Sequence, residues 1–220
     1  MNKRKQGDKN TVIAVLTGDI VRSTALSQLM YDDLLYSLNS QLTMICNNHP
    51  ANQFAITRGD SFQVILHDPE YAAKYALLIR TSLKSQCINY DCRISIGIGR
   101  DPVIRQSIGH STGDAFTLSG RALDEMKSHT LKISTLDSQF NEHFHLLTEY
   151  VDQQVATMTE RQCAIAYLLL KKDKPLTQGE IADKLGANRV SINRSIKSAN
   201  ITLIEDYIIL FAKKITEYFR

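Results

Sequence analysis

Few features of this sequence point to a specialised class of protein. Its 220 residues contain only four cysteines, with neither a CxxC spacing nor a paired framework, at Cys46, Cys87, Cys92 and Cys163. We therefore expect reduced thiols that pack as small apolar side chains. No apolar run is long enough to span a membrane. The basic start leads directly into a strand-like segment and has no signal-peptide core, so we expect a cytoplasmic protein without a membrane partner.

Common catalytic and nucleotide-binding patterns are also missing. The chain has neither a Walker-type nor a GxGxxG phosphate loop, and no Ser/His/Asp set stands at a spacing that indicates a nucleophile. The composition, 43% hydrophobic and 22% charged, is ordinary for a globular protein. A chain of 220 residues is long enough for one large domain or two small ones.

The net charge of +3 is small, but it is unevenly distributed. The first ten residues carry Lys3, Arg4, Lys5 and Lys9 against Asp8 alone. Residues 151–220 hold eleven Lys and Arg against eight Asp and Glu, so the segment between them is acidic. A basic arm, an acidic centre and a basic end are typical of a sensor or enzyme body attached to a nucleic-acid-binding module.

The segment LTQGEIADKLGANRVSINRSIKSA, residues 176–199, predicts two short helices joined by a turn. Thr177 and Glu180 have the spacing of a capping box at the start of the first helix. Gly186 suits the left-handed residue that ends it, and Asn188 suits the N-cap of the second. Each helix has an apolar face, made by Ile181, Ala182 and Leu185 in the first and by Ile192, Ile196 and Ala199 in the second.

The other face of the second predicted helix is polar and basic, with no acidic residue. It presents Arg189, Ser191, Asn193, Arg194 and Lys197. In a major groove, Arg and Asn read base edges, whereas Lys and Ser hold phosphates. The pattern resembles the bacterial helix-turn-helix and predicts binding of double-stranded DNA. The alternatives are an αα-hairpin with a solvated basic face, or a relative of the motif that mediates only protein contacts.

Two further helices are expected around this pair, over residues 159–170 and from residue 204 to the C-terminus. The last one has an apolar stripe at three- and four-residue spacing and lacks the turn residues of a β-wing. That stripe either packs back on its own chain or pairs with a second copy. A homodimer would suit DNA binding, because two-fold symmetric proteins read two half-sites. The stripe consists of Ile204, Tyr207, Ile208, Phe211, Ile215 and Phe219.

The N-terminal part predicts alternating strands and helices of an α+β fold. Strands are expected at residues 12–18, 54–57, 62–66 and 92–99, with helices at residues 26–46 and 70–84. A tight turn at residues 58–61 makes a hairpin of the second and third strands. A helix at residues 114–127 and a strand at residues 131–135 follow. The order β-α-β-β-α-β, then α-β, is that of a ferredoxin-like palm.

This topology places Asp19, after the first strand, beside Asp60 in the hairpin. Two carboxylates brought together in this way can hold Mg²⁺ or Mn²⁺ with a nucleotide. The alternative is that both aspartates only cap turns, where Asp is common.

Four segments resemble the motifs of class III nucleotide cyclases: TGDIVRST, ITRGDSFQVIL, RISIGIG and GDAFTLSGRAL. The resemblance implies that Asp19 and Asp60 are the metal aspartates and that Arg121 holds phosphate. Thr117 stands where active cyclases have an Asn. Ile56 and His110 stand where the purine-reading Lys and Asp would be. The resemblance therefore preserves the metal pair without the residues that select a base.

The chain is more similar to the SatD family of bacterial proteins. The shared motifs are Gly18-Asp19-Ile20, Gly59-Asp60-Ser61-Phe62-Gln63, residues 93–99, and Ala115-Phe116 with Arg121-Ala122. This resemblance covers nearly the whole chain and implies a nucleotide-cyclase-like palm followed by an all-α helix-turn-helix domain.

We therefore expect a basic arm over residues 1–10, a nucleotide-cyclase-like α+β domain over 11–150 and a DNA-binding domain over 151–220. The function expected is a DNA-binding transcriptional regulator with a degenerate cyclase-like sensor or dimerisation domain. One alternative is a metal-dependent nucleotidyl cyclase-like enzyme that uses Asp19, Asp60 and Arg121. Another is a protein-interaction adaptor. The replaced purine positions favour a role other than catalysis.

Overall fold

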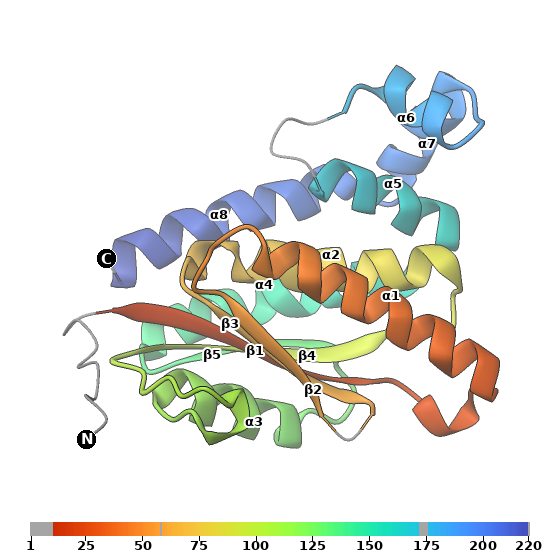
Figure 1. Ribbon diagram of the computed structural model, residues 1–220. Helices are drawn as coiled ribbons and strands as arrows, with labels where there is room; N and C mark the ends of the chain where they lie inside the picture. The colour runs from red at the N-terminus through yellow and green to blue at the C-terminus, as the bar shows by residue number, and fades with distance from the viewer. Residues whose placement is uncertain (1–10, 58, 172–175, 220) are drawn as a thin grey trace.

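The computed structural model describes residues 11–57, 59–171 and 176–219 (Figure 1). The basic arm expected over residues 1–10 lies outside the described residues, as do Arg58 of the hairpin turn and residues 172–175 before the predicted helix pair. Within the described part of the chain, no helix is both long enough and apolar enough to cross a bilayer.

A five-stranded mixed sheet forms the centre of the fold. Its strands are β1 (Val12–Ile20), β2 (Gln53–Thr57), β3 (Ser61–Leu66), β4 (Cys92–Arg100) and β5 (Leu131–Thr135), in the order β2-β3-β1-β4-β5. β1 is antiparallel to both β3 and β4, whereas β5 is parallel to β4. The first four strands thus have the ferredoxin-like arrangement predicted from the sequence, with β5 added at one edge. The α+β class is confirmed.

Helices cover both faces of the sheet (Figure 1). Alternate residues of β1 point to opposite faces. Ala14 and Leu16 join the apolar core under α1 (Gln28–Cys46) and α2 (Ala72–Gln86), whereas Ile13 and Val15 join a smaller core under α3 (Asp114–Glu125). The helix of residues 26–46, the hairpin and the strand of residues 131–135 all form close to where they were expected.

Two glycines of β4 allow α3 to lie close to the sheet. A Cβ built on Gly97 would stand 2.1 Å from the carbonyl oxygen of Ala115, and one on Gly99 would stand 2.5 Å from the nitrogen of Ala115. Neither distance is tolerable for a real side chain, so these two positions accept only glycine at this spacing. The glycines of the RISIGIG segment thereby leave room for the backbone of α3, which covers this strand.

Helix α4 (Ser138–Thr157) was not predicted from the sequence. Asp137 caps it, because its Oδ1 accepts a hydrogen bond from the nitrogen of Phe140 at 2.7 Å. Phe140 and Phe144 stack with ring centroids 4.5 Å apart, and both rings meet Phe211 edge-on. The domain boundary expected at residue 150 falls inside this helix, and the division into domains stays a prediction.

The C-terminal part consists of α5 (Glu160–Leu170), α6 (Gln178–Lys184), α7 (Arg189–Ser198) and α8 (Ile201–Phe219). The predicted capping box of α6 is confirmed, since Thr177 and Glu180 bond each other reciprocally. Gly186 has a φ of 57°, as the turn requires, and Asn188 accepts from the nitrogen of Ser191 at 2.8 Å. Local sequence signals therefore set both ends of the α6–α7 turn.

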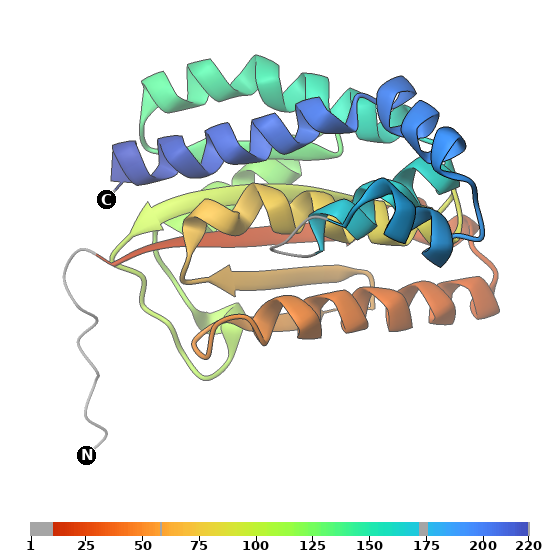
Figure 2. The same cartoon turned by 90° about the horizontal axis from the view of Figure 1, so that it is seen from above.

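These helices are attached to the sheet-bearing part by apolar packing. Helix α5 packs on α2, and the predicted stripe of α8 is buried against the body, where the hydroxyls of Tyr207 and Thr148 lie 2.9 Å apart. Figure 2 shows α8 lying alongside α4. Of the two possibilities left open by the sequence, the stripe that begins at Ile204 packs back on its own chain.

A buried ion cluster ties together four elements of the body. The fully buried guanidinium of Arg80, on α2, donates to Asp152 of α4 at 2.7 Å and to both oxygens of Asp91, before β4, at 2.9 Å. Asp152 also accepts from the nitrogen of Thr130, before β5, at 2.8 Å. Burial alone would lower the pKa of Arg80, but the two carboxylates raise it above its usual value.

Candidate functional site

The backbone positions of the two aspartates singled out in the sequence lie close together at one end of the sheet, as the topology predicts. Asp19 lies near the end of β1, opposite Ser61 in the β1–β3 register. The nitrogen of Ile20 donates to the carbonyl oxygen of Asp60 at 3.0 Å. The turn of the β2–β3 hairpin is thereby fastened to the end of β1.

The carboxylate of Asp19 is bound by an arginine that the sequence reasoning missed. Arg93 is its register partner on β4. Arg93 Nε donates to Asp19 Oδ1 at 2.8 Å, Nη2 donates to Oδ2, and Nη1 donates to the carbonyl oxygen of Met126 at 2.8 Å. The hydrogen bond to Asp19 raises the pKa of Arg93 above its usual value. Asp19 is therefore held in a bidentate ion pair.

Asp60 has different partners. The Ser23 hydroxyl donates to Asp60 Oδ2 at 3.2 Å, and the Ser61 hydroxyl lies 3.5 Å from Oδ1. Ser23 belongs to a short 3-10 turn, Ser23–Ala25, directly after β1. Asp60 thus links the hairpin to the turn that follows β1.

This arrangement does not fit a divalent metal held between Asp19 and Asp60. The Arg93 guanidinium donates to both oxygens of Asp19, so it neutralises that carboxylate and would repel a cation placed beside it. Among the described residues, no group of three or more His, Cys, Asp or Glu side chains is placed to hold a metal ion. The structure therefore offers no basis for deriving a metal-dependent step here.

The third residue of the enzyme hypothesis, Arg121, is exposed on α3. Within the described structure, no hydrogen bond or ion pair joins it to Asp19 or Asp60, and its role stays a prediction. Ser119, two residues earlier, faces the sheet and lies 2.8 Å from the Thr17 hydroxyl. Thr117 is exposed as well, and its hydroxyl donates to the carbonyl oxygen of Gly113 at 3.3 Å.

A small polar group continues from Asp19 along the same face of the sheet. Gln63 Nε2 donates to the Thr17 hydroxyl at 3.2 Å, beside the Thr17–Ser119 contact. Ser95 is the register partner of Thr17, and its fully buried hydroxyl makes no hydrogen bond within the described structure. Alternation along β1 places Thr17 on the same face as Asp19.

The second predicted site, the polar face of α7, is only partly free. Arg189, Arg194 and Lys197 are exposed. Ser191 is held by Arg161 of α5, whose Nη2 donates to its hydroxyl at 3.0 Å, and Gln178 of α6 lies 3.5 Å from Asn193 Oδ1. The structure therefore leaves the three cations accessible and ties the two smaller polar side chains to neighbouring helices.

Helix α7 is held on the body by its other face. Ile192 is fully buried and Ala199 almost so. Gln162 of α5 donates to the Ser198 hydroxyl at 3.0 Å. Because α5 itself packs on α2, the exposed cations are presented from a helix anchored to the sheet-bearing part of the chain.

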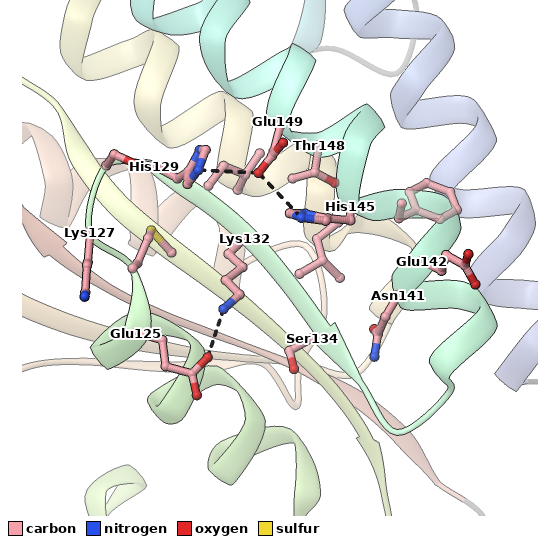
Figure 3. Close-up of a pocket in the computed structure, with 15 residues that line it drawn as sticks. Glu125, Lys127, His129, Lys132, Ser134, Asn141, Glu142, His145, Thr148 and Glu149 are labelled. Carbon is pink, nitrogen blue, oxygen red and sulfur yellow. Dashed lines mark hydrogen bonds and ion pairs between the residues drawn. The ribbon is translucent and has the colours of Figure 1, made fainter.

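A cavity of about 530 Å³ lies between the end of α3, strand β5 and α4 (Figure 3). Glu149 Oε1 lies 3.4 Å from His129 Nε2 and 3.6 Å from His145 Nε2, and Lys132 pairs with Glu125 at 3.0 Å. The wall therefore carries one Lys–Glu ion pair and a carboxylate that lies beside two imidazoles. Such a lining does not select one chemical class of ligand.

No protein-family model matches the chain, and no curated protein matches it. Among solved structures, it is similar to a bacterial light-regulated adenylyl cyclase, with 16% identity over 56% of this chain and 76% of that one and a TM-score of 0.41. It is also similar to the monomeric guanylyl cyclase domain of the RhoGC fusion protein from the aquatic fungus Blastocladiella emersonii. There the identity is 20% over 64% of this chain and 88% of that one, with a TM-score of 0.44. The functional conclusion therefore depends on the residues of this chain.

Proposed function

We propose that the protein binds double-stranded DNA, with α6 and α7 as a helix-turn-helix and α7 as the helix that enters the major groove. The observation that carries this proposal is the exposed face of α7, where Arg189, Arg194 and Lys197 stand without an acidic residue on the helix. A solvated helix face normally mixes both signs of charge. A face of one sign complements a phosphate backbone.

The way α7 is presented supports the proposal. A recognition helix contacts base edges with its N-terminal residues. Asn188 caps that end, and Arg189 follows it as the first helical residue. Arg194 lies further along the helix, and Lys197 lies in its last turn. We assign the two arginines to base edges or neighbouring phosphates and Lys197 to a phosphate.

Ser191 and Asn193 were expected from the sequence to contact DNA, but we propose a different role for them. Their bonds to Arg161 and Gln178 hold α7 against α5 and α6. We therefore assign them to setting the angle of α7, and the three exposed cations to contacts with the duplex.

The rest of the chain is proposed to act as a sensor or scaffold for α7. The Arg93–Asp19 ion pair supports a role that is independent of a metal. We also propose that the protein is a member of the SatD family and acts in transcription, because its sequence carries the motifs shared with that family.

Fluorescence anisotropy with a pool of random duplexes at low salt tests the proposal. The wild-type chain is expected to bind with an affinity that falls as salt rises. Arg189→Ala or Arg194→Ala should each weaken binding by about 1–3 kcal/mol where the residue reads a base. Lys127→Ala is the charge-matched control, because Lys127 is exposed in the connection between α3 and β5. Absence of duplex binding at low salt, or an equal loss in the control, contradicts the proposal.

A further inference from the structure

The outer side of α8 carries an exposed apolar surface. The inner stripe of this helix is buried against the body, yet Leu203, Ile209 and Leu210 remain 62%, 66% and 38% exposed. Single exposed apolar residues are ordinary on a protein surface. Three on one side of one helix, close to more on a neighbouring helix, mark an interaction surface.

The neighbouring helix is α4, which runs antiparallel to α8 (Figure 2). The Tyr207–Thr148 contact of 2.9 Å and the Asn200–Gln154 contact of 3.5 Å set their register. The same stretch of α4 carries two exposed apolar side chains, Leu147, which is 39% exposed, and Tyr150, which is 69% exposed. Exposed apolar side chains therefore occur on both of these neighbouring helices.

The charges on the outer side of α8 indicate what covers it. Residues 203, 206, 210, 213 and 217 are all exposed and recur at alternating three- and four-residue spacing, the period of a helix–helix seam. Asp206 lies one turn before the midpoint between Ile209 and Leu210, and Lys213 lies one turn after it. An antiparallel copy of α8 would therefore bring each Asp206 opposite a Lys213.

We propose that the outer side of α8 pairs with the same side of α8 in a second copy of this chain. The two-fold axis passes near Ile209 and Leu210, and the apolar side chains of both copies meet around it. An isologous interface of this kind must be self-complementary. The two-fold axis creates two Asp206–Lys213 pairs of opposite charge, so the surface is self-complementary. We include Leu147 and Tyr150 of α4 at the border of this contact.

The pairing would place the two α7 helices at opposite ends of the seam. With a rise of 1.5 Å per residue, the two Ile201 positions would lie about 26 Å apart along the helix direction. Helix α7 directly precedes α8 in each copy. The recognition helices would then be spaced on the order of one turn of DNA, roughly 34 Å. This spacing rests on the proposed function, whereas the pairing of α8 does not.

Light scattering after size exclusion measures the mass of the full chain directly. The wild type is expected to run at twice the chain mass of 24.8 kDa. The double variant Ile209→Glu, Leu210→Glu should be a monomer with an unchanged circular dichroism spectrum, because both side chains are exposed. Leu29→Glu is the matched control, since Leu29 is 80% exposed but belongs to α1 and not to the exposed apolar surface of α8. A monomeric wild type, or a dimer that persists in the double variant, overturns the proposal.

Charge reversal tests the register. Asp206→Lys and Lys213→Asp should each weaken the dimer at least tenfold, because each places like charges opposite one another twice. Mixing the two single variants should restore a dimer, since both pairs are then opposite in sign. Failure of the mixture to associate overturns the two-fold register. Arg194→Ala should weaken DNA binding and keep its dimeric mass, so failure of the dimer and failure of DNA binding are distinguishable.

Discussion

Arg93 and Asp19 stand opposite one another on β4 and β1, and the guanidinium binds the carboxylate at both of its oxygens. A third donor of Arg93 reaches the carbonyl oxygen of Met126, just after α3. One side chain thereby neutralises the aspartate and ties two strands to the end of the covering helix. The same pair disfavours a metal ion at this end of the sheet, because Arg93 neutralises the carboxylate that would bind it.

Replacing Arg93 tests the structural side of this pair. Arg93→Ala should lower the free energy of unfolding by about 1–3 kcal/mol, because it leaves a partly buried carboxylate without its charged donor. Urea unfolding followed by circular dichroism measures the change. Arg93→Lys should recover only part of it, since an ammonium cannot make the bidentate contact. A loss in Arg93→Ala smaller than about 0.5 kcal/mol would show that the pair adds little to stability.

The same pair makes a prediction about metal ions. Millimolar Mn²⁺ should leave the melting temperature of the wild type unchanged, because Arg93 already compensates the charge of Asp19. Arg93→Ala should be stabilised by Mn²⁺, since Asp19 is then free beside Asp60. Thermal melts with Mn²⁺, and with Ca²⁺ for comparison, provide the measurement. Stabilisation of the wild type that disappears in Asp19→Asn would restore the metal hypothesis.

Replacing Arg80, the buried arginine of α2, should lower the free energy of unfolding far more than replacing Arg93. Arg80→Ala leaves Asp91 and Asp152 without their shared cation, and removing one partner of a buried pair costs about 3–5 kcal/mol. Ser85→Ala on the same helix loses only a hydroxyl that donates to the carbonyl oxygen of Ser82. Urea unfolding should separate the two variants clearly. Equal stabilities would mean that the cluster does not anchor α2 to α4.

Two glycines in neighbouring elements should respond with opposite signs. Gly97→Ala places a Cβ 2.1 Å from the carbonyl oxygen of Ala115 and should destabilise the fold by about 1–3 kcal/mol or more through overpacking. Gly120→Ala in α3 meets nothing within 4 Å and should stabilise by about 0.5–1 kcal/mol, because alanine favours a helix. Melting temperatures of both variants test the spacing between α3 and β4. Tolerance of Gly97→Ala would contradict it.

His67 should make stability depend on pH. Its ring stacks on His49 with centroids 5.5 Å apart, and its buried Nδ1 has no partner within the described structure. Burial, followed by repulsion from His49, lowers the pKa of His67 below 6.5. The unfolded chain then binds more protons, so this contribution to stability is lost as pH falls through about 6.5. His67→Phe should flatten the decline in urea midpoint between about pH 7.5 and 5.5. An unchanged slope would exclude His67 as its source.

Local signals allowed much of the fold to be predicted. The capping box of Thr177 and Glu180 and the turn glycine Gly186 act within a few residues, so the sequence indicates them directly. Helix α4 was missed although its signal is also local, since Asp137 caps it and buried residues such as Phe140, Phe144 and Val151 recur at helical spacing.

The candidate site likewise has features that the sequence predicts and features that depend on tertiary contacts. The meeting of Asp19 and Asp60 follows from strand order, which the pattern of elements predicts. The Arg93 partner depends on the residue-by-residue register of two strands distant in sequence. The bond from Arg161 to Ser191 likewise depends on how α5 crosses α7. These contacts are tertiary, so a helical pattern alone could not show that Ser191 is already engaged.

Selection of duplexes from a random library by the full chain, followed by sequencing, tests the central claim most directly. An enriched motif is expected for the wild type. Arg189→Ala or Arg194→Ala should relax the preference at individual base pairs, whereas Lys127→Ala should leave the motif unaltered. DNA binding by α7 is contradicted if the wild type enriches no sequence and retains no more DNA than a variant that lacks all three exposed cations of α7.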